Sequence, residues 1–380
     1  MTIATSAGTR SLAADLGSAH PFEDSDPPGQ WLAMHIFYTS SNNPLLTECV
    51  IPLLRDLRQD GLLQRFFFIR YWMEGPHIRL RLRPHRPEDE EEIRRRAEEK
   101  VAAFLARRPA LYEVDPEVLA PVYKELFLAE YSEEDWLAKY GTNGQIPLRE
   151  NNTWAYIDYE PEYDRYGGPD GVRLAEWHFE QSSTTVLHLT ETANVHVRAV
   201  LFGLAAQMMV AMAVAFSGSV AETARFFEDY GAFWEARNQD ANRTRASAYE
   251  AAYTDMSESL TKRVGGIRAA VSEHDFSRLN GFMRHWAEHC LELRDHIARL
   301  TAQQRMIFPA YEEGTRTTAA PRPVTDLSLV LRILLTGYVH MTNNRLGVSI
   351  VDEIYLAYVL RRAFTDLAAQ ADLAGQEGKR

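Results

Sequence analysis

The chain has 380 residues, of which 46% are hydrophobic and 25% are charged, as in folded proteins with two domains or one large domain and a subdomain. Its net charge of −12 and pI near 5.5 argue against direct nucleic-acid binding and against binding to an anionic membrane. Two cysteines, Cys49 and Cys290, are too few for a disulfide framework or a zinc cluster, so a cytoplasmic location is expected.

Two segments, the N-terminus and one long apolar stretch, could be mistaken for targeting or membrane-spanning sequences. Residues 1–28 are rich in Ser, Gly, Asp and Pro and lack the apolar stretch of a signal peptide, so a disordered tail is expected. Residues 199–218 carry no charge and are long enough to cross a bilayer. They are rich in alanine and lack an aromatic belt, which favours a buried core helix and no membrane contact.

The N-terminal part mixes strand and helix patterns. A strand is predicted at 31–39, a helix at 44–61, a β-hairpin at 65–72 and 77–83, a helix at 87–108, and a last strand at 153–162 after a mixed stretch. The order β-α-β-β-α-β is that of the ferredoxin-like fold. The charged run RRRAEEK in the second helix is interpreted as a solvated helix face.

The rest of the chain reads almost entirely as helix. Helices are predicted at 173–189, 194–217, 219–237, 241–264, 276–303, 324–345 and 349–372. The fold class is therefore α+β, with a ferredoxin-like N-terminal unit followed by a mostly helical C-terminal part. The expected domains are a mixed α/β subdomain at 29–172 and a helical subdomain at 173–372.

The segment EGPHIRLRLR, residues 74–83, alternates basic and aliphatic side chains. Successive side chains of a strand point to opposite faces, so four basic residues are predicted to share one face: His77, Arg79, Arg81 and Arg83. A row of cations repels itself unless an anion or partnering carboxylates lie against it. With Arg70 on the hairpin partner, an anion-binding strand and a solvated face balanced by acidic neighbours both stay open.

Two further segments carry residue types that suit chemistry. In YEPEYDRYGGPDG, residues 159–171, Glu162 and Arg165 lie three apart before a glycine pair, as in a turn with a local ion pair or in a site at a strand end. In GYVHMTNNRLG, residues 337–347, His340 is either a satisfied core residue or a general base suited to neutral pH. Phosphate-binding, HExxH and GxSxG motifs are absent, so no metal and no cofactor are predicted.

Taken together and in this order, the three segments resemble the C-terminal elimination domain of class I lantibiotic dehydratases, which also occurs as free-standing proteins in thiopeptide gene clusters. The resemblance extends from about Trp31 to about Ala363. It implies that the segments converge in one site with five catalytic residues, Arg79, Arg81, Glu162, Arg165 and His340. Candidate substrate-binding residues in or beside the same segments are Arg70, His77, Asn344 and Arg345.

The resemblance also implies a reaction. A separate glutamylation protein would use glutamyl-tRNA to esterify Ser or Thr of a precursor peptide that carries a leader. This chain would then act as a lyase, removing the α-proton and expelling glutamate to leave dehydroalanine or dehydrobutyrine. The tRNA would bind the partner and not this acidic chain.

Two other functions stay open. Free-standing pyridine synthases with the same fold join two dehydroalanines by formal [4+2] cycloaddition and release the leader peptide. A non-catalytic module that binds leader peptide is the third reading. The retained histidine and arginines favour elimination over both. A homodimer is expected only because twofold oligomers are common.

Overall fold

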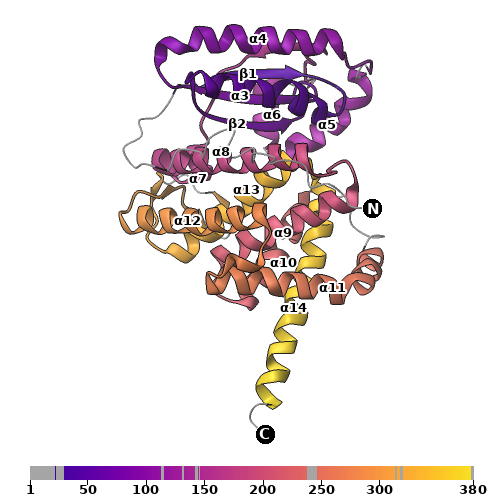
Figure 1. Cartoon of the computed structure of the whole chain (residues 1–380), viewed down its shortest axis with the longest axis vertical. Coiled ribbons are helices and arrows are strands. Elements are labelled where there is room, and N and C mark those ends of the chain that lie inside the picture. Colours follow the sequence, from indigo (N-terminus) through magenta and orange to yellow (C-terminus); the bar gives the residue numbers. More distant parts are fainter. Residues whose placement is uncertain are drawn as a thin grey trace, which may run out of the picture. The chain divides into compact units, whose positions relative to one another are not determined.

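The computed structural model describes residues 22, 30–112, 115–130, 132–141, 144, 146–237, 246–312, 315–316 and 320–377 (Figure 1). The predicted tail at 1–28 lies outside the described residues, apart from Phe22. The fold is α+β, with a small antiparallel sheet and many helices.

The chain forms two compact units that interleave along the sequence. The first comprises residues up to 123, 145–160 and 179–193, and the second comprises 124–144, 161–178 and 194–380. Helix α8 (Gly168–Thr192) contributes its first half to the second unit and its second half to the first. The domain boundary expected between 172 and 173 stays a prediction.

The first unit is built on a four-stranded sheet in the order β2-β3-β1-β4, with every neighbouring pair antiparallel. Its strands are β1 (Leu32–Phe37), β2 (Leu63–Tyr71), β3 (His77–Pro84) and β4 (Thr153–Tyr156). The predicted strand 31–39 and the hairpin are confirmed. Strand β4 stops at Tyr156, well before residue 162, because proline and charged residues follow it.

The helices of this unit cover one face of the sheet. They are α2 (Asn42–Leu45), the π-helical η1 (Leu46–Val50), α3 (Ile51–Gln59), the 3₁₀ turn η2 (Pro87–Asp89) and α4 (Glu90–Arg107). Helices α3 and α4 contact the strands (Figure 1). The apolar side chains Ile78, Leu80 and Leu82 of β3 are fully buried. The alternation in β3 therefore places its aliphatic face against the core of the unit.

The opposite face of the sheet carries the basic side chains, and it is covered as well. The second half of α8 lies against it, with the Phe67 and Phe179 ring centroids 5.5 Å apart. The backbone N–H of Phe68 donates to Ser183 Oγ at 3.2 Å. His77, Arg81 and Arg83 are consequently buried, so the reading of this row as a solvated face is wrong.

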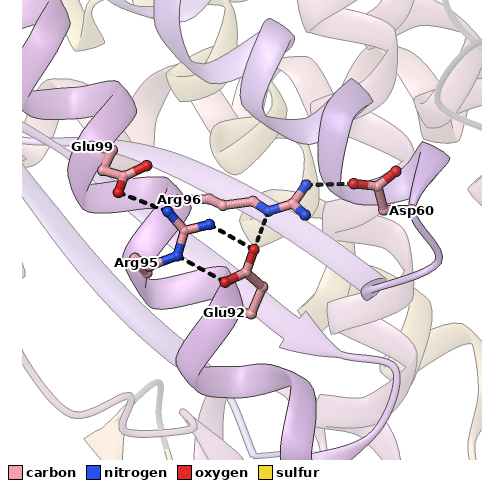
Figure 2. A network of polar contacts seen from close by, with 5 residues as sticks. All are labelled: Asp60, Glu92, Arg95, Arg96 and Glu99. Atoms are coloured by element: carbon pink, nitrogen blue, oxygen red, sulfur yellow. Dashed lines mark hydrogen bonds and ion pairs between the residues drawn. The ribbon is translucent and has the colours of Figure 1, made fainter.

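The charged run in α4 does form a solvated face (Figure 2). Arg95 pairs with Glu92 and Glu99, each at 2.7 Å, and Arg96 pairs with Glu92 at 2.6 Å and with Asp60 at 2.5 Å. Hydrogen bonds from Arg95 and Arg96 lower the pKa of Glu92 to about 2. The prediction for this run is confirmed, and such exposed pairs contribute little stability.

The second unit is organised around helix α9 (Arg198–Phe216). This helix contacts five others: α10 (Val220–Arg237), α11 (Ala246–Glu273), α12 (Gly281–Ala302), α13 (Leu327–Leu346) and α14 (Ile350–Glu377). It is long and apolar enough to cross a membrane, but 67% of its most apolar window is buried inside the structure. A helix that is apolar on all sides belongs in a core, so the predicted core helix is confirmed.

Several short elements have no counterpart in the predictions. Helices α5 (Pro116–Glu130) and α6 (Glu133–Tyr140) lie in the stretch of mixed character, and α7 (Tyr163–Tyr166) is a single turn. The helix predicted at 276–303 begins as a separate 3₁₀ turn, η4 (Phe276–Arg278), and continues as α12 from Gly281. Four two-residue strands pair between α12 and α13: β5 (Ile307–Phe308) with β8 (Arg322–Pro323), and β6 (Tyr311–Glu312) with β7 (Thr315–Arg316).

Candidate active site

Strand β3 of the first unit holds Arg79 in a fixed setting. The Nδ1 of His77 lies 2.8 Å from the Gly75 carbonyl oxygen, so Nδ1 carries the proton and Nε2 is an acceptor. That Nε2 accepts from Arg79 Nε at 3.3 Å. The Arg79 guanidinium also lies 3.4 Å from the ring centroid of Tyr71. One edge of the guanidinium is thus anchored, and its remaining donors are available to a ligand.

Arg81 is a buried cation that has no anionic partner in the part of the chain that the structure describes. The residue is only 4% exposed, and its Nε and Nη1 have no hydrogen-bond acceptor among the described residues. Its guanidinium lies 5.5 Å from the Tyr159 ring centroid. Burial, and then repulsion by Arg79, lowers the pKa of Arg81 to about 9, so it is still charged at neutral pH. A buried, charged group of this kind calls for an anionic partner.

A buried carboxylate on the same side of the sheet pairs with arginines outside the row. Glu180 of α8 is fully buried and pairs with Arg58 at 2.5 Å and with Arg65 at 3.2 Å. Arg65 stands opposite Arg83 in the β2–β3 register, so Glu180 balances cations that lie beside the row. No such pair involves Arg79 or Arg81 in the part of the chain that the structure describes.

Arg70 does not share a sheet face with these residues. It stands opposite Ile78 in the β2–β3 register, whereas Arg79 stands opposite Ile69. Its Nη2 donates to Asn43 Oδ1 at 2.8 Å, and burial lowers its pKa to about 10. Its role in substrate binding stays a prediction, and the register separates it from Arg79 and Arg81.

In the second unit, Glu162 and Arg165 flank the short helix α7. Glu162 precedes the helix, and Arg165 Nη1 lies 3.1 Å from Glu162 Oε1 with both side chains about half exposed. The neighbouring Tyr166 ring stacks on Tyr338 of α13, with 5.9 Å between centroids and 13° between planes. This contact ties the loop to the helix that carries His340.

The glycine pair after this loop is required by its backbone and by its neighbours. Gly167 has a φ of +91°, and a Cβ there would lie 2.6 Å from Met306 Cε and 2.9 Å from Phe308 Cζ. We expect Gly167→Ala to lower the free energy of unfolding by about 3 kcal/mol, as measured by urea denaturation. Gly203→Ala is the control, because that helical glycine has open space around it and should gain up to about 1 kcal/mol. Equal effects of the two substitutions would contradict this description of the loop.

His340 is held by a buried carboxylate. Its Nδ1 lies 3.0 Å from Oε1 of Glu353 on α14, and the Glu353 side chain is fully buried. The hydroxyl of Tyr230 on α10 donates to Glu353 Oε2, and burial beside Glu353 raises the pKa of Tyr230 well above its usual value. The Trp234 ring lies 4.5 Å from the imidazole. Because Nδ1–H faces the carboxylate, Nε2 is left as the basic nitrogen.

The other predicted residues of this helix have structural contacts. Arg345 is fully buried, and its Nη1 donates to the Met341 carbonyl oxygen at 2.8 Å. The Asn344 carbonyl oxygen accepts from the Gly347 N–H at the end of α13. A role for these two residues in substrate binding stays a prediction.

Sequence reasoning missed Glu353 as a partner of His340. It lies 13 residues further along, beyond the turn that joins α13 to α14. The sequence does contain a sign that Glu353 is buried, because it lies on the same side of the helix as the buried residues Ala357 and Leu360. A carboxylate on the apolar side of a helix requires a polar partner.

Glu353→Gln is expected to lower the turnover rate about 100-fold or more without changing KM. The Gln amide can donate toward Nδ1, which would favour the tautomer with its proton on Nε2 and remove the base. Steady-state kinetics would measure this effect once a substrate is in hand. Tyr230→Phe leaves the carboxylate on His340 and should cost far less. A Glu353→Gln variant with full turnover would contradict this role.

Comparison with known proteins bears on the fold and the family. The family model described as lantibiotic biosynthesis dehydratase C-terminal matches residues 31–364. The chain belongs to this family. The resemblance inferred from the three motifs is therefore confirmed. No curated protein matches the sequence.

Two solved structures, TbtD and TsrL, share the fold of this chain at low sequence identity, and a third has a lower TM-score. The pyridine synthase TbtD from thiomuracin biosynthesis has a TM-score of 0.68 and 19% identity, covering 89% of this chain and 98% of its own. TsrL has a TM-score of 0.59 and 17% identity, covering 89% and 95%. The tRNA-dependent lantibiotic dehydratase MibB from Microbispora sp. 107891 has a TM-score of 0.45 and 20% identity, covering 97% of this chain and 29% of its own.

Proposed function

We propose that the chain is a lyase that eliminates glutamate from glutamylated Ser or Thr of a ribosomal precursor peptide. The observation that carries this proposal is the His340–Glu353 pair, with 3.0 Å between Nδ1 and Oε1. Nε2 of His340 takes the α-proton of the esterified residue, the Cα=Cβ bond forms, and the Cβ–O bond breaks. Glutamate leaves through its ester carboxylate, a far better leaving group than hydroxide.

Arginine guanidinium groups supply the electrostatic part of the proposal. Loss of the α-proton develops enolate charge on the adjacent peptide carbonyl, and the glutamyl group brings carboxylate charge. Fixed cations that face such charge in a dry site lower the barrier strongly. Arg79 and Arg81 are assigned to the glutamyl group, because the described residues provide neither with a carboxylate. Arg165 is assigned to the enolate charge, with Glu162 3.1 Å away to orient it.

Formal [4+2] ring formation is the second candidate function. It is supported by the fold shared with the pyridine synthase TbtD, a likeness that extends over most of both chains. At 19% identity this support concerns the fold alone. The third candidate, a silent module that binds leader peptide, has no use for a histidine oriented by a buried carboxylate.

Purified protein and two synthetic peptides separate these functions. One peptide carries a glutamyl ester on serine, and the other carries two dehydroalanines behind a leader. Mass spectrometry should show loss of glutamic acid from the first and no change in the second. Release of the leader with a new aromatic ring would establish the second candidate instead. Binding of both peptides without either product would support the third.

Partners and fold type complete the proposal. The leader-bearing precursor and a separate glutamyl-tRNA-dependent glutamylation protein supply the substrate in the cytoplasm, and the chain acts without nucleic acid or membrane, as a monomer or homodimer.

The first unit is ferredoxin-like. Support for this comes from β3, which pairs with both β1 and β2 and so splits the β-α-β connection between them.

A further inference from the structure

Two buried side chains on neighbouring strands hold polar hydrogens that have no acceptor in the described part of the chain. His35 on β1 is 3% exposed, and neither of its ring nitrogens has a hydrogen-bond partner there. Arg81 on β3 is similarly buried, with Nε and Nη1 unpartnered. Because buried polar groups are nearly always paired, unpaired donors of this kind indicate a ligand or ordered water.

The strand register brings these donors together. His35 stands opposite Arg79 in the β1–β3 pair, and Arg81 stands opposite Ala33, so all four side chains belong to one sheet face. On the other side of His35, strand β4 places Ala155. Ala33 and Ala155 thus lie beside His35 on this face, and an alanine side chain offers no polar partner to the imidazole.

His35 differs from the neighbouring His77 because its ring nitrogens have no hydrogen-bond partner among the described residues. Both ring nitrogens of His77 are engaged, by Gly75 and by Arg79. The His35 ring lies against His77 with 4.9 Å between centroids. Burial, and then the nearby cations beginning with Arg81, lowers the pKa of His35 to about 2. Its ring is therefore neutral and offers a single N–H donor.

The charges around His35, Arg79 and Arg81 favour an anionic ligand. Arg149, a further cation near His35, is already paired with Glu74 at 2.9 Å. Glu180 pairs with Arg58 and Arg65 instead of with the arginines of β3 near His35. Two cations and one neutral donor suit a carboxylate, and a neutral donor adds a hydrogen bond without adding repulsion between the guanidinium groups.

We infer that His35 is a specificity-determining residue whose N–H, together with Arg79 and Arg81, binds the side-chain carboxylate of the glutamyl group. This inference rests on the proposed function. Glutamate taken from a glutamyl-tRNA is joined through its α-carboxyl group, so the side-chain carboxylate is the free anion that the substrate brings. The site distinguishes a glutamyl group from a glutaminyl group of nearly the same shape.

Titration calorimetry with two non-eliminable peptides tests the inference. In both, 2,3-diaminopropionate replaces serine, and its amide carries glutamate in one peptide and glutamine in the other. The wild type should bind the glutamyl peptide at least tenfold more tightly. His35→Phe keeps an aromatic ring against His77 but removes both nitrogens, so this preference should shrink several-fold. Its Tm without peptide should be unchanged or higher, because an unpaired buried donor has gone.

Two further variants sharpen the result. His35→Gln restores an N–H donor and should recover part of the preference, which also guards against a His35→Phe protein that fails to fold. His188→Phe is the matched control, since His188 of α8 also has a buried Nδ1 without a partner among the described residues but lies outside the sheet. It should keep the full preference.

Equal affinity of the wild type for the two peptides, or an unchanged preference in His35→Phe, would overturn the inference. Elimination is measured separately with the ester peptide. A wild-type protein that prefers the glutamyl amide through His35 but never eliminates the ester would support this site and contradict the proposed lyase activity.

Discussion

Replacement of His340 by alanine is expected to lower the rate of glutamate loss by roughly 10³-fold, within the usual range for a general base. Glutamylated peptide should accumulate, and its dissociation constant should stay near the wild-type value because Nε2 acts on the Cα proton and not on binding. Mass spectrometry of timed reactions measures the first quantity, and calorimetry with the non-eliminable peptide measures the second.

Two controls accompany this variant. His285→Ala removes an exposed histidine of α12 from the same unit and should retain full activity. The double variant His340→Ala with Glu353→Gln should be no slower than His340→Ala alone, because residues that act as one unit lose their effect together. A rate for His340→Ala within a few-fold of the wild type would remove His340 from the mechanism.

Arg81→Met is expected to change activity and stability in opposite directions. The rate at low substrate concentration should fall by about 10²- to 10³-fold, because the glutamyl group loses a fixed cation that holds it. The free energy of unfolding should be unchanged or rise by about 1–3 kcal/mol, because a buried donor set without an acceptor is replaced by an apolar side chain of similar length. Kinetics and urea denaturation measure the two effects.

Arg65→Met on the neighbouring strand provides the matched comparison. Arg65 is equally buried, but it pairs with Glu180 at 3.2 Å. Its removal should lower the free energy of unfolding by about 3 kcal/mol, since the buried carboxylate then loses one of the arginines that pair with it. If Arg81→Met were destabilised as much as Arg65→Met, the buried guanidinium of Arg81 would have an internal partner, and its assignment to a ligand would fail.

The strands of the first unit could be predicted because their signals are local. Alternation over residues 77–83 fixes which side chains share a face, and the register confirms it. Which basic side chains of that face pair with a carboxylate could not be predicted from the same residues. Glu180, which neutralises Arg65, lies 115 residues away and reaches it only through the packing of α8.

The side-chain partners of the candidate residues could not be predicted from the sequence. The motif around residue 340 singled out the histidine as a candidate, but its partner Glu353 lies beyond the turn, in the helix predicted at 349–372. His35 looked like one polar residue in an apolar strand, and only the pairing of β1 with β3 sets it opposite Arg79. Long-range pairing of this kind depends on tertiary packing, which sequence periodicity does not encode.

Helices α5 and α6 were missed for a different reason. Pro121 interrupts the helical pattern of α5, and α6 is only eight residues long. Strand β5, which packs against Gly167, and its partner β8 are likewise two residues long, too short for alternation to be visible.

A glutamyl-serine peptide deuterated at Cα tests the central claim most directly. The account predicts that the wild type releases glutamate together with the deuterium, leaves dehydroalanine, and reacts several-fold more slowly than with the undeuterated peptide. Release of glutamate with the deuterium retained and serine regenerated would mean simple ester hydrolysis, and it would contradict elimination by a base at His340.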